Sequence, residues 1–117
     1  MKPSVGRTVH YQLGVGDVEA INQRRSDAQA FRRRVTRHMG GGETDPGYEG
    51  RTGHVEHTGN AVSEGDVYPA VIVRTFGSDL GTSNLHVLLD GNDSYWATSR
   101  TEGDEPGNWH WPERAGD

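Results

Sequence analysis

The 117-residue sequence contains no cysteine, which excludes disulfide bonds and thiolate chemistry and is typical of proteins in a reducing compartment. It also lacks the run of about 18 apolar residues that a membrane helix requires and the apolar segment of a secretion signal. We therefore expect a soluble protein that has no contact with membranes and stays in the cytoplasm.

Apolar residues are scarce as well. Only 31% of the residues are hydrophobic, the mean hydropathy is -0.84, and 17 residues are glycine. Three Trp, four Tyr and two Phe offset this shortage, because each aromatic side chain buries a large area. We expect one domain, residues 1–117, with a small core that self-association completes, and hence a homo-oligomer.

The sequence motifs of common enzyme classes are missing. There is no GxSxG, HExxH or phosphate-binding-loop motif, and Gly14–Gly16 is followed by Asp17 instead of the rest of a dinucleotide-binding fingerprint. We predict that the protein is not an enzyme and needs no cofactor. The alternative is a small phosphodiesterase built on histidines in strands, for which the candidates are His10, His54, His57, His86 and His110.

Two short segments carry side chains that bind metals in other proteins. In the segment His54–His57, His54 and Glu56 share a face of an extended strand, but zinc sites need three or four ligands and no partner motif is present. The segment Asp90–Asp93 lacks the spacing of a calcium-binding loop and its final Glu. We interpret the first as part of an edge strand and the second as a hairpin turn, and we predict no metal site.

Short runs of β-branched, aromatic and aliphatic residues, each bounded by turn residues, indicate strands. In the first run, Val9, Tyr11 and Leu13 alternate with polar residues, which predicts a strand with one buried face. The predicted strands are Arg7–Leu13, Val67–Phe76, Leu85–Leu89, Tyr95–Thr98 and Trp109–Trp111, with His54–Val62 as a further short edge strand. This pattern favours a mainly β fold with an inserted helix (α+β), a small, partly open SH3-like barrel of about five strands.

The inserted helix is predicted over about residues 17–39. Asp17 is a suitable N-cap, and three glycines end the pattern at residues 40–42. Ser26 and Gln29 form a second capping box, so two helices with a break near Ser26 are an alternative to one continuous helix. Residues 40–53 have little to bury and are predicted to be a mobile loop. The apolar positions at helical spacing are Val18, Ile21, Ala28, Phe31, Val35 and Met39.

Four stretches of the sequence resemble a family of short phage and prophage proteins. They are KPSVGRTVHY, EGDVYPAVIVR, VLLDGNDSYWATS and EGDEPGNWHWPER, and the resemblance covers roughly residues 2–23 and 59–114. We attach no catalytic residues or ligand to this family. The resemblance implies a phage protein that works in the host cytoplasm or on the virion, and it implies no particular chemistry.

Charge is distributed unevenly along the chain. Residues 1–58 carry a net charge of +2 and residues 59–117 a net charge of -7, which argues against general binding to nucleic-acid backbone. The predicted helix nevertheless contains a cluster of cations offset only by Asp27. These are Arg24, Arg25, Arg32, Arg33, Arg34 and Arg37, followed by His38.

Arginine is suited to phosphate recognition because its guanidinium is planar, always charged and weakly hydrated. We select Arg24, Arg25, Arg32 and Arg33 as candidate phosphate ligands, because three of them border the apolar stripe and face a cleft or an interface. Two alternatives stay open. The arginines form a solvated face that pairs with the acidic C-terminal half, or the helix contacts nucleic acid.

Aromatic residues gather in the late strands. Trp109 and Trp111 are two residues apart and therefore share a face, with His110 opposite. We select Trp96, Trp109 and Trp111 as candidates for stacking on a base, and packing in the core is the alternative interpretation.

The combined hypothesis is a non-enzymatic phage protein that binds a small phosphate-containing ligand, such as a nucleotide, at a homo-oligomer interface. In the phage setting, such a protein would sequester a nucleotide signal of host immunity, as an anti-defence sponge. The alternative is a protein–protein interaction module. It would be either a minor virion component or an adaptor that binds a host protein through the same helix.

Overall fold

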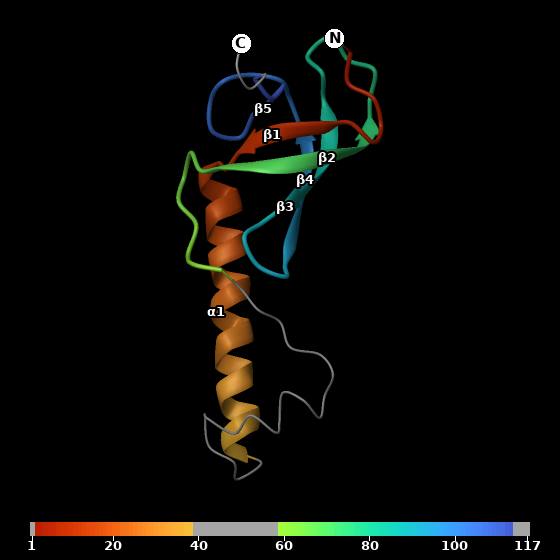
Figure 1. Cartoon of the computed structure of the whole chain (residues 1–117). Coiled ribbons are helices and arrows are strands. Elements are labelled where there is room, and N and C mark those ends of the chain that lie inside the picture. The colour runs from red at the N-terminus through yellow and green to blue at the C-terminus, as the bar shows by residue number, and fades with distance from the viewer. Residues whose placement is uncertain (1, 39–58, 114–117) are drawn as a thin grey trace.

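A computed structural model of the chain describes residues 2–38 and 59–113, with side chains in the helix up to Phe31. The chain forms one helix and five strands in the described part (Figure 1). In chain order these are β1 (Thr8–Gln12), α1 (Val15–His38), β2 (Val67–Thr75), β3 (Ser83–Leu88), β4 (Ser94–Arg100) and β5 (Trp109–His110).

The five strands form one sheet in the order β4-β3-β2-β1-β5, and every pair of neighbours is antiparallel. Strands β2, β3 and β4 follow one another as a meander. Strand β1 lies between β2 and β5 and pairs with both. Among the described strands the sheet does not close. The predicted fold class is confirmed: the protein is mainly β with a helix inserted after the first strand, compatible with a small, partly open barrel.

The core lies on one face of the sheet. Val9, Tyr11 and Leu13 are fully buried, as their alternation predicts. Strands β2, β3 and β4 contribute core residues from the same face, although a bulge between Ile72 and Arg74 interrupts the alternation of β2. Ile21 and Val62 complete the cluster from outside the sheet. The other members are Ala70, Ile72, Leu85, Val87, Leu89, Ala97 and Trp109.

Helix α1 begins two residues earlier than predicted and is continuous. Asp17 is the third helical residue, not the N-cap, and its carboxylate reaches back to accept a hydrogen bond from the Gly14 amide (2.8 Å). The helix passes through Ser26 without interruption, so the alternative of two helices is wrong.

Among its described positions, the apolar stripe of the helix is fully buried at Ile21 and exposed at its far end. Ile21 is buried and Val18 packs against the core, but Phe31 is 59% exposed. Figure 1 shows the physical reason, because the helix runs alongside the sheet only at its N-terminal end and then extends past it. Val35 lies among helical residues whose side chains are not described, and Met39 lies outside the described residues.

Strand boundaries agree with the predictions to within two residues, and β4 runs two residues further than predicted, to Arg100. Near its end, Ser99 has a positive φ of 55° and its amide donates to the Asn84 side-chain oxygen (2.8 Å). The register of β4 against β3 shifts at this point, which is a bulge. Because a bulge redirects the following side chain, Arg100 can reach helix α1.

Part of the predicted edge strand, His54–Val62, is described. Its residues 59–62 form no strand, which corrects the prediction for these positions, and residues 54–58 lie outside the described residues. The predicted loop at residues 40–53 also lies outside them. In the part of the chain that is described, no helix combines the length and apolar character needed to cross a membrane.

Candidate functional site

Arg25 and Asp93 form a buried ion pair between helix α1 and the loop that joins β3 to β4. Arg25 Nε donates to Asp93 Oδ2 (2.8 Å) and Arg25 Nη2 donates to Asp93 Oδ1 (3.1 Å). The two side chains are only 5% and 2% exposed. Hydrogen bonds from Arg25 hold the pKa of Asp93 below its usual value, although burial opposes this shift.

The guanidinium of Arg25 also holds two backbone segments together. Its Nη1 donates to the carbonyl oxygen of Asn60, and its Nη2 donates to the carbonyl oxygen of Asp90 (3.2 Å). Arg25 therefore joins the helix, the segment that precedes β2 and the β3–β4 loop, a structural role that occupies its donors.

Arg24 contacts the same carboxylate from the solvent side. Its Nη2 lies 3.1 Å from Asp93 Oδ2, and its side chain is 42% exposed. Two of the four arginines predicted to bind phosphate thus pair with a residue of the acidic C-terminal half. Arg32 and Arg33 lie in helix α1, and their side chains are outside those described.

A second buried cluster surrounds Asp17 in the first turn of the helix. Asp17 accepts hydrogen bonds from the Tyr11 hydroxyl and from Arg100 Nη2 (2.7 Å), in addition to the Gly14 amide. The Arg100 guanidinium also lies over the Tyr11 ring, 5.9 Å from its centroid. Burial, and then the neighbouring Asp17 carboxylate, raise the pKa of Tyr11 well above its usual range, and burial raises the pKa of Tyr95.

The three tryptophans do not converge on one surface. Trp109 is fully buried and its indole N–H donates to the Gly81 carbonyl oxygen (3.1 Å). Trp111 meets Trp109 edge to face, 5.3 Å between ring centroids, and the Arg7 guanidinium covers Trp111 at 5.6 Å. Trp96 lies on the opposite face of the sheet and is 63% exposed.

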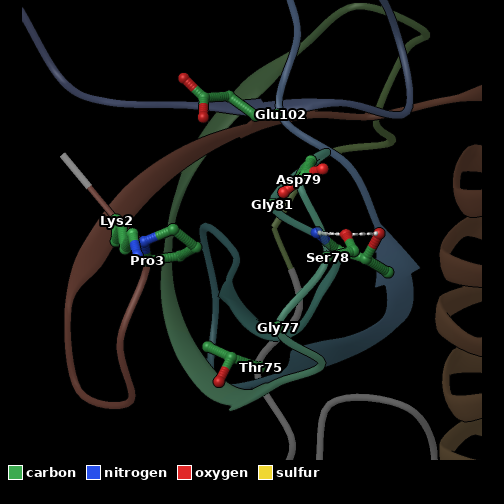
Figure 2. Close-up of a pocket in the computed structure, with 9 residues that line it drawn as sticks. Lys2, Pro3, Thr75, Gly77, Ser78, Asp79, Gly81 and Glu102 are labelled. Atoms are coloured by element: carbon green, nitrogen blue, oxygen red, sulfur yellow. Dashed lines mark hydrogen bonds between the residues drawn. The ribbon is translucent and has the colours of Figure 1, made fainter.

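Two adjoining pockets, of about 300 Å³ and about 340 Å³, lie at one end of the sheet, and both are lined by Asp79 and Glu102. The first is shown in Figure 2, with Lys2 and Ser78 among its walls. His110 lines the second, and its buried Nδ1 has no hydrogen-bond partner among the described residues. None of the arginines or tryptophans predicted to bind a ligand lines either pocket. Because two carboxylates line both, these pockets are unsuited to a phosphate.

The histidines of the described residues do not gather with carboxylates into a metal-binding group. His10 and His110 stack edge to face, 5.7 Å between ring centroids, and no cluster of three possible metal ligands occurs among the described residues. The segment His54–His57 lies outside them. The segment Asp90–Asp93 joins two antiparallel strands, as predicted for a hairpin loop. Nothing in the described part of the chain indicates catalysis.

Comparisons with known proteins leave the family open. No family model, curated protein or solved structure matches the chain. The resemblance to short phage proteins therefore stays a prediction, and the site has to be interpreted from its own geometry.

Sequence reasoning missed the two carboxylates that organise the helix. Asp93 was assigned only to a turn, and Asp17 only to a helix cap. The one available signal was the excess of acidic residues after residue 58, which predicts partners for the arginines without saying which carboxylate meets which guanidinium.

Proposed function

We propose that the protein is a non-enzymatic interaction module that presents residues 26–38 of helix α1, called here the basic arm, to an acidic surface of another protein. One observation carries the proposal. Ion pairs at Asp17 and Arg25 anchor the first half of the helix, and its backbone continues past the sheet through a segment rich in arginine (Figure 1).

The two anchors define the direction of the helix. Asp17 pairs with Arg100, and Arg25 pairs with Asp93. The anchoring residues Asp17 and Arg25 are separated by about 12 Å along the helix axis, at about 1.5 Å per residue. A rod held at two such points cannot swing freely, so the segment beyond Arg25 is held in one orientation to the sheet.

The basic arm itself has the composition of a binding element. It contains Arg32, Arg33, Arg34 and Arg37, and Asp27 is its only acidic residue. Phe31 is exposed beside these cations. Because a helical segment of this length is marginal in water without packing, a partner that covers Phe31 and neutralises the arginines would stabilise it.

A macromolecular partner fits better than a small anionic ligand. Arg24 and Arg25 are already paired with Asp93, and Trp109 is in the core, so these candidates offer no shared pocket for a nucleotide. A protein partner also fits better than nucleic acid, since the rest of the chain is acidic and would repel an extended phosphate backbone. In the phage setting that the resemblance implies, the partner is a host protein or another virion protein.

Binding of a fluorescent polyglutamate peptide, measured by anisotropy, tests the proposal. The double variant Arg32→Glu and Arg33→Glu should lose binding. The matched control Lys2→Glu and Arg74→Glu makes the same change in net charge at exposed positions off the helix, and it should retain most of the binding.

Three results would contradict the proposal that the basic arm binds an acidic protein surface. Equal losses in the two double variants would mean that only overall charge matters. Binding of duplex DNA in preference to the peptide would point to nucleic acid. A selective rise in melting temperature with one nucleotide, lost in the Arg32/Arg33 variant, would restore the hypothesis of a small-ligand trap.

A further inference from the structure

The basic arm carries an exposed phenylalanine as well as its arginines. The Phe31 side chain is 59% exposed in helix α1. Among the described side chains, no aromatic ring stacks on it and no guanidinium lies over its ring. Phe76 is the other phenylalanine of the chain and is 47% exposed, but the Arg74 guanidinium lies 5.4 Å from the centroid of its ring. Phe31 is therefore the phenylalanine that the described fold leaves more open to a partner.

The helical backbone places other apolar positions on the same side as Phe31. Ala28 precedes it by three positions and Val35 follows it by four, and positions at these spacings are neighbours on one face of a helix. Arginines occupy positions on both borders of this apolar strip. Arg34 comes three positions after Phe31, and Arg32 comes four positions after Ala28. The backbone thus combines a narrow apolar strip with cationic borders in one segment.

We propose that the basic arm binds as a helix in an apolar groove of its partner, a groove that carboxylates border, and that Phe31 inserts into it as the main apolar contact. This inference rests on the proposed function and adds to it the kind of surface that the partner presents. An amphipathic helix that lays its apolar side in a groove is a common mode of protein recognition. Here the cationic borders require acidic groups along the edges of the groove.

Charge complementarity favours such a partner over other occupants of this face. The arm contains four arginines and one aspartate, so two copies that met through it by two-fold symmetry would bring like charges together. A surface made only of carboxylates would neutralise the arginines, but it would leave Phe31 in water and lose the hydrophobic gain of burying it. An acidic surface with an apolar groove satisfies both kinds of side chain.

The two kinds of side chain should affect different rate constants. The arginines attract an acidic partner from a distance, so they raise the association rate and make it depend on salt. Phe31 acts only after contact, because the hydrophobic effect depends on area removed from water. It should therefore slow dissociation, which is where most differences in affinity between related complexes arise.

Two fluorescent peptides of equal length and equal charge test the proposal with the full chain. In the first, called the amphipathic peptide, glutamates alternate with leucines at helical spacing. In the second, called the polar peptide, glutamine replaces every leucine, because the two residues have similar helix propensity. Stopped-flow anisotropy measures association and dissociation separately. We expect the amphipathic peptide to dissociate from wild type more slowly than the polar peptide by about tenfold or more, the effect of a buried aromatic hot spot.

Phe31→Ala should remove this difference. Its dissociation from the amphipathic peptide should be faster by about tenfold or more, while its binding of the polar peptide stays as in wild type. The matched control Phe76→Ala removes an exposed phenylalanine that lies off the helix, and it should keep the difference. The double variant Arg32→Glu and Arg33→Glu should slow association with both peptides. Circular dichroism establishes that each variant is folded, and alanine is the better helix former at position 31.

The outcomes separate this inference from the proposed function. Equal dissociation of the two peptides from wild type, or a difference that persists in Phe31→Ala, would overturn the groove and leave the acidic partner standing. Binding that does not respond to the Arg32/Arg33 double variant, or no binding of either peptide, would overturn the proposed function and this inference with it. If Phe31→Ala changes the sedimentation of the chain alone, Phe31 is a contact between copies, which also overturns the groove.

Discussion

Arg25 donates two hydrogen bonds to Asp93, a residue 68 positions further along the chain, and neither side chain is more than 5% exposed. This contact joins the helix to the far hairpin of the sheet. It also changes the interpretation of the arginine cluster, because Arg25, a buried member of it, has a structural role.

Replacing Arg25 by leucine should destabilise the protein by about 3–5 kcal/mol, because it leaves the Asp93 carboxylate buried without its partner. Chemical denaturation measures the loss. The neighbouring change Arg24→Leu is the control and should cost at most about 1 kcal/mol, since Arg24 is 42% exposed. Similar losses of unfolding free energy in the two variants would show that the buried Arg25–Asp93 ion pair stabilises the protein no more than the exposed contact of Arg24.

The Asp93 contact should make stability depend on pH on the acid side. The pKa of Asp93 is lowered in the folded state, so its contribution is present above the unfolded pKa of about 4 and is lost as pH falls through the folded value. We expect the unfolding free energy of wild type to fall more steeply below about pH 4 than that of Asp93→Asn. If the free energy of unfolding falls with pH equally in wild type and in Asp93→Asn, groups other than Asp93 cause the loss of stability in acid.

Replacing Tyr11 by phenylalanine should cost about 1–3 kcal/mol, because the buried Asp17 carboxylate loses a donor. The pKa of Tyr11 is raised, so this group contributes stability that is complete below the unfolded pKa of about 10 and is lost as pH rises above it. Wild type should therefore lose more stability than Tyr11→Phe at alkaline pH. Ultraviolet absorbance should detect ionisation of Tyr11 only as the protein unfolds, and its ionisation in the folded state would contradict this account.

Gly59 should tolerate no side chain. A Cβ at this position would lie 1.9 Å from the Asp90 carbonyl oxygen, in the region where Asn60 and Asp90 accept hydrogen bonds from Arg25. We expect Gly59→Ala to cost about 1–3 kcal/mol through this overlap. Gly16→Ala is the opposite control, because Gly16 is helical with open space around its Cβ, and it should be neutral or stabilise by up to about 1 kcal/mol. Thermal unfolding of the two variants distinguishes these outcomes.

Much of the fold could be predicted because its causes are local. Alternation at Val9, Tyr11 and Leu13 required one buried face, and glycine, asparagine and aspartate between apolar runs required turns. The boundaries were less accurate where a distant contact sets them. Strand β4 continues to Arg100 because a bulge against Asn84 turns that side chain toward Asp17 on the helix.

The candidate site was less predictable, because residues of one type have different roles in it. Arg24 and Arg25 are neighbours in sequence, yet one is half in solvent and the other is buried, since only one side of the helix meets the β3–β4 loop. Trp96 and Trp109 both follow strand patterns, but they lie on opposite faces of the sheet. Periodicity states which residues share a face within a strand, and it does not state which face the helix covers.

The sequence by itself determined the five strands of the sheet, the turns between them, the presence of a helix after the first strand and the uneven charge, because each depends on residues close together in the chain. Only the tertiary structure decided that Asp93 binds Arg25, that Trp109 is buried and that Trp96 is exposed. These outcomes depend on strand order and on where the helix crosses the sheet. Both are set by packing around one shared core. That packing brings together residues that are far apart in the sequence, and no periodic pattern in the sequence indicates which of them will meet.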